Sequence, residues 1–362
     1  MDRTGGLFGA NARPKFTDMV HIKKLDPSLV PKSNSLPTRP SLDSRRLIFI
    51  GDIHGCKEEL LQLLEEVKFD KRTDHLILLG DIITKGPESL DVIDVAIEMG
   101  ASCIRGNHED RVLLTYKDMM STLLPLKGPN EPASLGGVDN LDEESFSQGD
   151  YSDRALARRL KKKHYNYLSS CPVILRVGRI GKLGEVVAVH AGMVPGISLE
   201  LQDPYSVMTM RSIDLVSHIP SKLPPKDHVG KYTLNSDADA EKHQYLISWT
   251  KLWNKYQNLI PNPKRAFSRG NKEPELHTTV IYGHDSKQGL QIQKWTIGLD
   301  TGCVKGGKLT ALIIADGAAM SLRDVQCKDH RPRKPLQAEV EDVLREGAIS
   351  EGNRPENDES EE

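Results

Sequence analysis

Short apolar runs alternate with amphipathic stretches through the middle of the chain. Leucine and valine recur at helical spacing in Cys56–Phe69 and Ser89–Met99, and Trp295–Gly317 reads as two strands joined by a glycine-rich turn. Five runs have the length and β-branched content of buried strands: Arg46–Ile50, Leu76–Leu79, Ser102–Arg105, Val186–Val189 and Thr279–Tyr282. This alternation of strand and helix predicts an α/β fold with partly parallel sheets.

The two ends of the chain lack this pattern. Residues 1–44 are rich in Pro, Ser, Gly and Lys and show no period, so we expect a disordered basic, Pro-rich arm. Residues 45–320 form the predicted folded domain, with polar surface insertions at 121–155 and 215–245. Residues 321–362 end in EGNRPENDESEE and are predicted to be a polar, acidic, disordered tail.

Composition narrows the class of protein. Hydrophobic residues make up 38% and charged residues 28% of the 362 residues, which is typical of a globular protein with polar tails. The formal net charge of −2 gives no overall attraction to nucleic acid or anionic membranes. No stretch approaches the ~18 consecutive apolar residues of a membrane span, and the first residues lack the apolar region of a secretory signal. We expect a cytoplasmic protein, with the nucleus or an organelle as alternatives.

The cysteines are odd in number and scattered, with no C-x-x-C pair. This pattern predicts reduced packing thiols, not a disulfide framework or a zinc knuckle, at Cys56, Cys103, Cys171, Cys303 and Cys327.

Five polar clusters follow the predicted strands. Because ligand sites of α/β folds lie beyond the carboxyl ends of strands, we expect these clusters to converge. They read GDIHG from Gly51, GDIITKG from Gly80, GNHED from Gly106, HAG from His190 and GHD around His284. The candidate ligands for Zn, Mn or Fe are carboxylates, imidazoles and one amide: Asp52, His54, Asp81, Asn107, His190 and His284.

This set of ligands has a specific chemistry. A carboxylate such as Asp81 can bridge two cations roughly 3.5–4 Å apart, and a bridging solvent molecule then becomes the nucleophile. The cations also neutralise charge that grows on phosphoryl oxygens. One cluster alone would be read as an ordinary turn, because Gly-Asp and Gly-Asn commonly start turns. All five in this order indicate a two-metal hydrolase of phosphate esters or anhydrides.

The order of the clusters resembles that of the phosphoprotein phosphatase family of calcineurin-like metallophosphoesterases, over roughly residues 45–320. The resemblance implies a β-sandwich of two mixed sheets flanked by helices, holding two divalent ions (Zn, Mn, Co or Fe). Asp52 and His54 would hold the first metal and Asp81 would bridge. The second metal would be held by Asn107, His190 and His284.

The same resemblance assigns the residues that handle the substrate. His108 would be the general acid that protonates the leaving oxygen. Arg105, just before GNHED, and Arg211 would contact phosphate, and Lys85 occupies the position of a further phosphate-binding cation.

One cluster departs from the protein phosphatases, whose second motif reads GD-x-V-D-R-G. Here Thr84 replaces the aspartate and Lys85 the arginine. The change removes a carboxylate that would raise the imidazole pKa and hold its tautomer, and it replaces a bidentate fork with a point charge. This variant resembles the ApaH-like phosphatase branch, whose eukaryotic members resemble fungal zinc-dependent endopolyphosphatases and nucleoside-cap hydrolases.

We therefore predict hydrolysis of phosphoanhydride bonds, in inorganic polyphosphate or a dinucleoside polyphosphate. The substrate would be a phosphorylated small molecule or polyphosphate, with no specific nucleic-acid binding beyond a capped end. A serine/threonine protein phosphatase is one alternative, which Thr84 and Lys85 count against. A non-catalytic scaffold that binds phosphorylated partners is another, which the complete set of ligands counts against. A groove for a long polyanion could be lined by Lys85, Lys287, Lys305 and Lys308.

Overall fold

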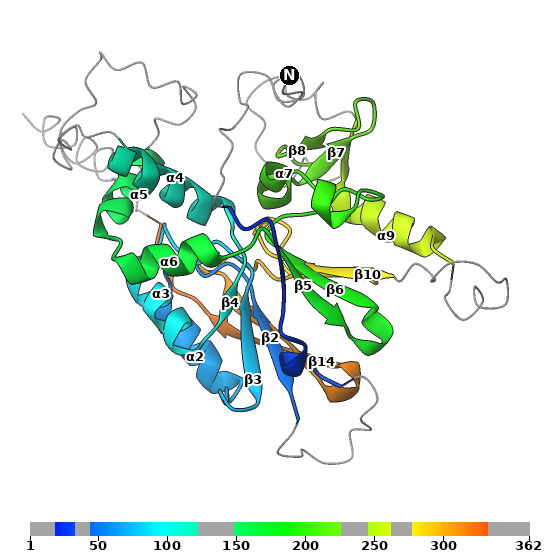
Figure 1. Cartoon of the computed structure of the whole chain (residues 1–362), viewed down its shortest axis with the longest axis horizontal. Helices are drawn as coiled ribbons and strands as arrows, with labels where there is room; N and C mark the ends of the chain where they lie inside the picture. Colours follow the sequence, from blue (N-terminus) through cyan, green and yellow to red (C-terminus); the bar gives the residue numbers. More distant parts are fainter. Residues whose placement is uncertain (1–18, 33–43, 122–147, 226–244, 262–276, 332–362) are drawn as a thin grey trace, which may run out of the picture.

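Two mixed β-sheets pack face to face, and helices cover their outer faces (Figure 1). The computed structural model describes residues 19–32, 44–121, 148–225, 245–261 and 277–331. Within these residues no helix is both long and apolar enough to cross a membrane. The α/β prediction and the predicted pair of mixed sheets flanked by helices are confirmed.

The first sheet has five strands in the order β14-β13-β2-β3-β4. Strands β2, β3 and β4, which precede the first three clusters, run parallel to one another. Strands β13 and β14 form an antiparallel hairpin, and β13 pairs antiparallel with β2. Their bounds are β2 (Arg46–Ile50), β3 (Asp74–Leu78), β4 (Ser102–Cys103), β13 (Lys308–Ala315) and β14 (Ala319–Gln326).

The second sheet has six strands in the order β1-β5-β6-β10-β12-β11, in which β6, β10 and β12 are parallel. Their bounds are β1 (Ile22–Lys24), β5 (Ile174–Arg179), β6 (Glu185–Val189), β10 (Thr278–Tyr282), β11 (Gln291–Ile292) and β12 (Thr296–Gly298). A small antiparallel sheet joins β7 (Ser212–Asp214), β8 (Pro220–Ser221) and β9 (Leu246–Ser248).

Helices bury both outer faces of this sandwich. Side chains of α2 to α6 pack on the five-stranded sheet, and those of α7 and α9 pack on the six-stranded sheet. Their bounds are α2 (Lys57–Glu66), α3 (Ser89–Glu98), α4 (Asn107–Ser121), α5 (Gln148–Arg159), α6 (Lys162–Ser170), α7 (Pro204–Thr209) and α9 (Trp249–Leu259). Short 3-10 turns lie at Pro27–Leu29, Gly181–Leu183, Leu199–Leu201 and Asp316–Ala318.

Strand β2 shows why the strands read as continuous apolar runs. Leu47 and Phe49 enter the core between the two sheets, whereas Ile48 and Ile50 enter the core beneath the helices. Successive side chains of a strand point to opposite faces, and here both faces are buried. The apolar run therefore has no polar alternation.

The predicted ends of the domain need correction. Strand β1 lies inside the range predicted as a disordered arm, where it pairs with β5, and β14 extends from the predicted domain into the predicted tail. Both are edge strands with mostly exposed side chains, so their sequences carry no apolar period. Helix α5 and strand β8 likewise occupy parts of the predicted insertions. The remaining residues of the arm, insertions and tail lie outside the described residues.

The prediction of five reduced cysteines is wrong for one pair. Cys303 and Cys327 form a disulfide across 24 residues of sequence, whereas Cys56, Cys103 and Cys171 are free and buried. The β13–β14 hairpin brings the two positions together, because Lys308 lies opposite Gln326 at its open end. Because this disulfide depends on which residues of the two strands lie opposite each other, the spacing of the cysteines in the sequence does not reveal it.

Candidate metal centre

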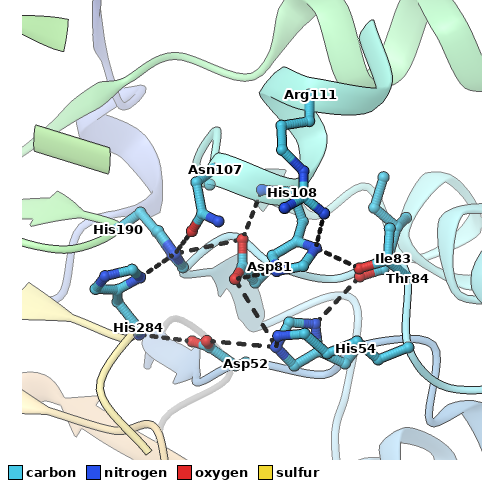
Figure 2. A network of polar contacts seen from close by, with 12 residues as sticks. Asp52, His54, Asp81, Ile83, Thr84, Asn107, His108, Arg111, His190 and His284 are labelled. Atoms are coloured by element: carbon cyan, nitrogen blue, oxygen red, sulfur yellow. Dashed lines mark hydrogen bonds and ion pairs between the residues drawn. The ribbon is translucent and has the colours of Figure 1, made fainter. Parts of the chain in front are cut away.

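The clusters predicted from the sequence meet at one edge of the sandwich, beyond the carboxyl ends of strands from both sheets (Figure 2). Asp52 and His54 follow β2, and Asp81 follows β3. From the other sheet, His190 follows β6 and His284 follows β10. Asn107 and His108 open helix α4.

Asp81 lies at the middle of the group and is almost fully buried. Its Oδ2 atom lies 3.8 Å from His54 Nε2, and its Oδ1 atom lies 3.3 Å from His190 Nε2. One carboxylate therefore faces two imidazoles through its two oxygens, as a bridging ligand would.

Each side of Asp81 has further ligand atoms. On the first side, Asp52 Oδ2 lies 3.9 Å from His54 Nε2. On the second side, His190 Nε2 lies 3.1 Å from Asn107 Oδ1 and 3.2 Å from His284 Nδ1. All six predicted ligands thus converge, and Asp52 also connects the two sides because its Oδ1 accepts a hydrogen bond from the His284 amide at 3.0 Å.

Backbone carbonyls orient the three ligand imidazoles. His54 Nδ1 lies 3.2 Å from Ile83 O, His190 Nδ1 lies 2.9 Å from Leu79 O, and His284 Nε2 lies 3.1 Å from Thr209 O. A carbonyl can only accept, so we infer that these nitrogens carry the proton. The other nitrogen of each ring then faces the centre, where it can bind a metal once it carries no proton.

The charges of the centre suit cations. Burial, followed by the nearby charge of Asp300, raises the pKa of Asp52 well above its ordinary value. Burial also acts to raise the pKa of Asp81, but His190 and His108 outweigh it and hold that pKa well below its ordinary value. Buried carboxylates that repel one another are stabilised by a cation between them. The donor set and this electrostatic need both fit divalent metals.

His108 is held by two side chains at its Nδ1 atom. Thr84 Oγ1 lies 2.6 Å away and Arg111 Nη2 lies 3.3 Å away (Figure 2). A guanidinium can only donate, so Nδ1 accepts and the proton sits on Nε2, which lies 3.7 Å from Asp81 Oδ2. Thr84 therefore keeps a contact to the ring although it supplies no charge. Asp153 holds Arg111 in place through an ion pair of 2.8 Å.

Sequence reasoning missed Arg111 and Glu109. Arg111 lies three residues after His108 on α4, which places both on one helix face. Glu109 is fully buried, and its carboxylate accepts hydrogen bonds from the backbone amides of Asp81, Ile82 and Gly106 at 2.8–2.9 Å. Its position inside the GNHED cluster is the signal that could have identified it.

The loops of the centre are tightly constrained. A Cβ atom at Gly106 would overlap Asp81 Oδ1, and one at Gly283 would overlap Asp52 Oδ1. Among the described non-glycine residues, positive φ angles gather here, and β-branched residues rarely adopt them. The values are 50° for His54, 49° for Asp81, 70° for Thr84, 63° for Lys85 and 72° for His284.

The predicted phosphate-binding cations are placed unequally. Lys85 Nζ lies 2.9 Å from His54 Nε2, and Arg211 lies beside His284, where its charge adds to burial in lowering the His284 pKa. Arg105 does not join them. It is buried between α4 and α6, with Nη1 3.7 Å from Asp110 and Nη2 donating to Ser169 O at 3.1 Å. These contacts turn Arg105 away from the centre, and its assignment as a phosphate contact stays a prediction.

The predicted lysine groove is only partly supported by the structure. Lys305 donates to Ser286 Oγ at 2.9 Å, and its charge acts on Lys85. Lys308 instead pairs with Asp324 across the hairpin at 2.8 Å, and so is drawn to the opposite strand of the hairpin.

A pocket of about 170 Å³ adjoins the second side of the centre. Its wall includes His284 and Arg211, with Trp249 and Tyr282 packed edge to face behind them. Amide side chains that can both donate and accept complete the lining: Gln288, Gln291 and Gln293. On the first side, sequence reasoning missed Asp300, a buried carboxyl group whose charge adds to burial in raising the pKa of Asp52.

Comparisons with known proteins agree with this geometry. Residues 45–288 match the family described as calcineurin-like phosphoesterase. A zinc-dependent endopolyphosphatase of Saccharomyces cerevisiae is 26% identical over 309 residues, covering 81% of this chain and 86% of the relative. A symmetrical bis(5′-nucleosyl)-tetraphosphatase of Baumannia cicadellinicola is 28% identical over 292 residues, covering 74% and 89%. A crystal structure described as that of a diadenosine tetraphosphatase shares the fold, with a TM-score of 0.55 at 24% identity and coverage of 85% and 99%.

Proposed function

The chain belongs to the calcineurin-like phosphoesterase family, and from this premise we propose that it hydrolyses phosphoanhydride bonds in inorganic polyphosphate or a dinucleoside polyphosphate. It is an enzyme, since the family consists of metal-dependent hydrolases. Both substrate classes are those of relatives similar to it over most of the chain, an endopolyphosphatase and a bis(5′-nucleosyl)-tetraphosphatase.

The single observation that carries the proposal is the position of Asp81 between two sets of inward-facing ligand atoms. We propose that two divalent cations of the Zn, Mn, Co or Fe class bind here, the first at Asp52, His54 and Asp81 and the second at Asp81, Asn107, His190 and His284. When bound, such ions activate water and neutralise charge on the phosphoryl oxygens.

The protein's own residues then orient the substrate and place a proton. Arg211 and Lys85 lie beside opposite sides of the centre and supply positive charge for the phosphoryl oxygens. His108 turns its Nε2 proton toward the centre, where it donates to the oxygen that leaves.

The environment of His108 favours anhydrides over phosphoproteins. Burial lowers the pKa of this imidazole well below its ordinary value, and the Thr84 hydroxyl supplies no negative charge to raise it. A neutral imidazole is a weak acid. A leaving phosphate departs with less protonation than the alkoxide of a serine side chain, so a weak acid suffices for it.

A substrate panel tests this proposal. The purified protein, supplied with Zn²⁺, Mn²⁺ or Co²⁺, is given polyphosphate, diadenosine tetraphosphate, capped RNA and a phosphoserine peptide, and released phosphate or nucleotide is measured. We expect one of the anhydrides to have the highest kcat/KM and His190→Ala to abolish the activity. The exposed His218→Ala serves as the matched control. Faster hydrolysis of the phosphopeptide than of both anhydrides would refute the substrate class.

The cytoplasmic location predicted from the sequence stays a prediction. The Cys303–Cys327 disulfide argues for an oxidising compartment, because structural disulfides rarely persist in a reducing cytosol. Mass spectrometry of alkylated protein taken directly from cells would show whether the pair is oxidised there.

A further inference from the structure

A second group of metal-ligand side chains lies outside the centre built on Asp81. It consists of Cys56, Glu59 and His330, whose ligand atoms all lie within 4.8 Å of one another. Cys56 and Glu59 are buried, with 1% and 3% of their surface exposed, and the His330 side chain is 22% exposed. None of the three belongs to the six ligands of the catalytic centre.

Two of these residues come from the start of helix α2. Cys56 is the N-cap residue and Glu59 follows three residues later, so both side chains lie on one side of the first turn. N-cap positions favour side chains that bond the free amides of the helix, yet the Cys56 side chain makes no such bond. The thiol at this position is therefore not explained by capping.

The third residue, His330, comes from the segment after β14, far from α2 in the sequence. His330 lies three residues after Cys327, which is tied to Cys303 by the disulfide. The His330 amide donates to Val304 O at 3.0 Å, and the Cys327 amide donates to Gly307 O at 2.9 Å. The backbone that carries the imidazole is thus fixed independently of any ligand, which is how rigid binding sites are supported.

The imidazole is the least satisfied member of this group, since the Cys56 thiol donates a long hydrogen bond to His54 O at 3.9 Å. His330 Nε2 is buried and makes no hydrogen bond to the part of the chain that the structure describes. It lies 3.6 Å from Glu59 Oε1, which also accepts a hydrogen bond from the Lys328 amide at 3.1 Å. A separation of 3.6 Å is long for a hydrogen bond but close to the ~3.4 Å between neighbouring ligand atoms around tetrahedral zinc.

We propose that Cys56, Glu59 and His330 bind a divalent cation of the zinc class, at a site separate from the catalytic centre. Thiolate, carboxylate and imidazole are the ligands that zinc and cobalt share. A thiolate and a carboxylate together balance the charge of the ion, and the thiol proton passes to solvent on binding. The ion ties the segment after β14 to the start of α2, next to the loop that carries Asp52 and His54.

The test uses cobalt as a spectroscopic probe. The full-length protein, stripped of metal with a chelator and kept free of reductant, is titrated with Co²⁺ and its near-ultraviolet absorption is recorded. A thiolate-to-cobalt charge-transfer band is expected in the wild type, because Cys56 is one of the proposed ligands. The six catalytic ligands include no sulfur, so this band would report only the proposed site. Elemental analysis is expected to find one cobalt ion fewer per chain in Cys56→Ser and in His330→Ala.

Three variants make the test decisive. The charge-transfer band should vanish in Cys56→Ser and persist in Cys171→Ser, which removes another buried free thiol. It should also persist in Asp81→Asn, which disables only the catalytic centre. If Cys56→Ser does not fold, His330→Ala takes its place, since that side chain is partly exposed. No band in the wild type, a band that survives Cys56→Ser, or one that is lost in Cys171→Ser would each overturn the proposal.

Discussion

The two sides of the metal centre share Asp81 yet place His54 and His190 in opposite electrostatic environments. Burial, followed by the charge of Lys85, lowers the pKa of His54 to about 3. Burial also acts to lower the pKa of His190, but the Asp81 carboxylate outweighs it and raises that pKa to about 10. Before a metal binds, His54 is thus neutral and His190 protonated, whereas His284, whose pKa burial and Arg211 lower, resembles His54.

This difference has a chemical meaning. On the first side the His54 lone pair is available, but the Lys85 ammonium donates to the same Nε2 atom, so a metal must displace a hydrogen bond. On the second side a metal must displace a proton from His190. The second side also opens to the pocket beside Arg211, whereas Lys85 and the buried Asp300 lie beside the first.

Removing the shared carboxylate breaks both sides at once and has the largest expected effect. Asp81→Asn should lower kcat/KM by more than about 100-fold, since loss of even an outer-shell partner of a metal costs about 10–100-fold. It should also weaken the binding of both catalytic ions, as measured by elemental analysis after dialysis. Asp91→Asn, at an exposed position of α3, is the matched control. Loss of a single ion with normal activity would refute the bridging role.

A negative charge added beside His108 makes the first side of the centre more negative and leaves the second side unchanged. It therefore tests the electrostatic difference between the two sides. Thr84→Asp should raise the pKa of His108 and thereby increase the ratio of phosphopeptide to polyphosphate kcat/KM by about tenfold.

Thr84→Val is the matched control, since it removes the hydroxyl at nearly constant volume and adds no charge. The pH dependence of kcat separates the two variants, because only the carboxylate moves the apparent pKa of the acid. An unchanged substrate ratio in Thr84→Asp would contradict our account of this position.

The last prediction concerns the stability of the metal-stripped protein, in which no activity is measured. The pKa of His190 is about 10 in the folded state, above its ordinary value near 6.5. Its stabilising contribution is therefore complete below about pH 6.5 and is lost as the pH rises toward 10. At about 1.4 kcal/mol per pKa unit, a shift of this size predicts a loss of several kcal/mol in the free energy of unfolding, measured with urea. The slope should flatten in His190→Asn; an equal slope in both proteins would contradict the assignment.

The convergence of the six candidate ligands could be predicted from sequence because they follow strands, and the strands themselves are marked by buried apolar runs. Arg105 shows the limit of this reasoning. A residue after β4 can turn toward the centre or toward α6, and only the packing of that helix decides. Arg111 was missed because its role depends on the helix face it shares with His108.

The ends of the domain were predicted less well for a different reason. Strands β1 and β14 are edge strands whose exposed side chains leave no apolar period to detect. The Cys303–Cys327 disulfide depends on hairpin register, and the contact of His330 with Glu59 depends on the disulfide and the loop beside it. Features that arise from pairing between distant segments require the fold itself.

The left-handed backbone at Thr84 and Lys85 also bears on how this protein can evolve. Non-glycine residues in that conformation cost about 1–2 kcal/mol each, and a β-branched threonine is among the least suited to it. Glycine at either position would relieve that cost and remove the contact to His108 or to His54. At Thr84 and Lys85, a substitution that relieves backbone strain also removes a contact of the catalytic site. Selection for stability at these two positions therefore acts against selection for activity.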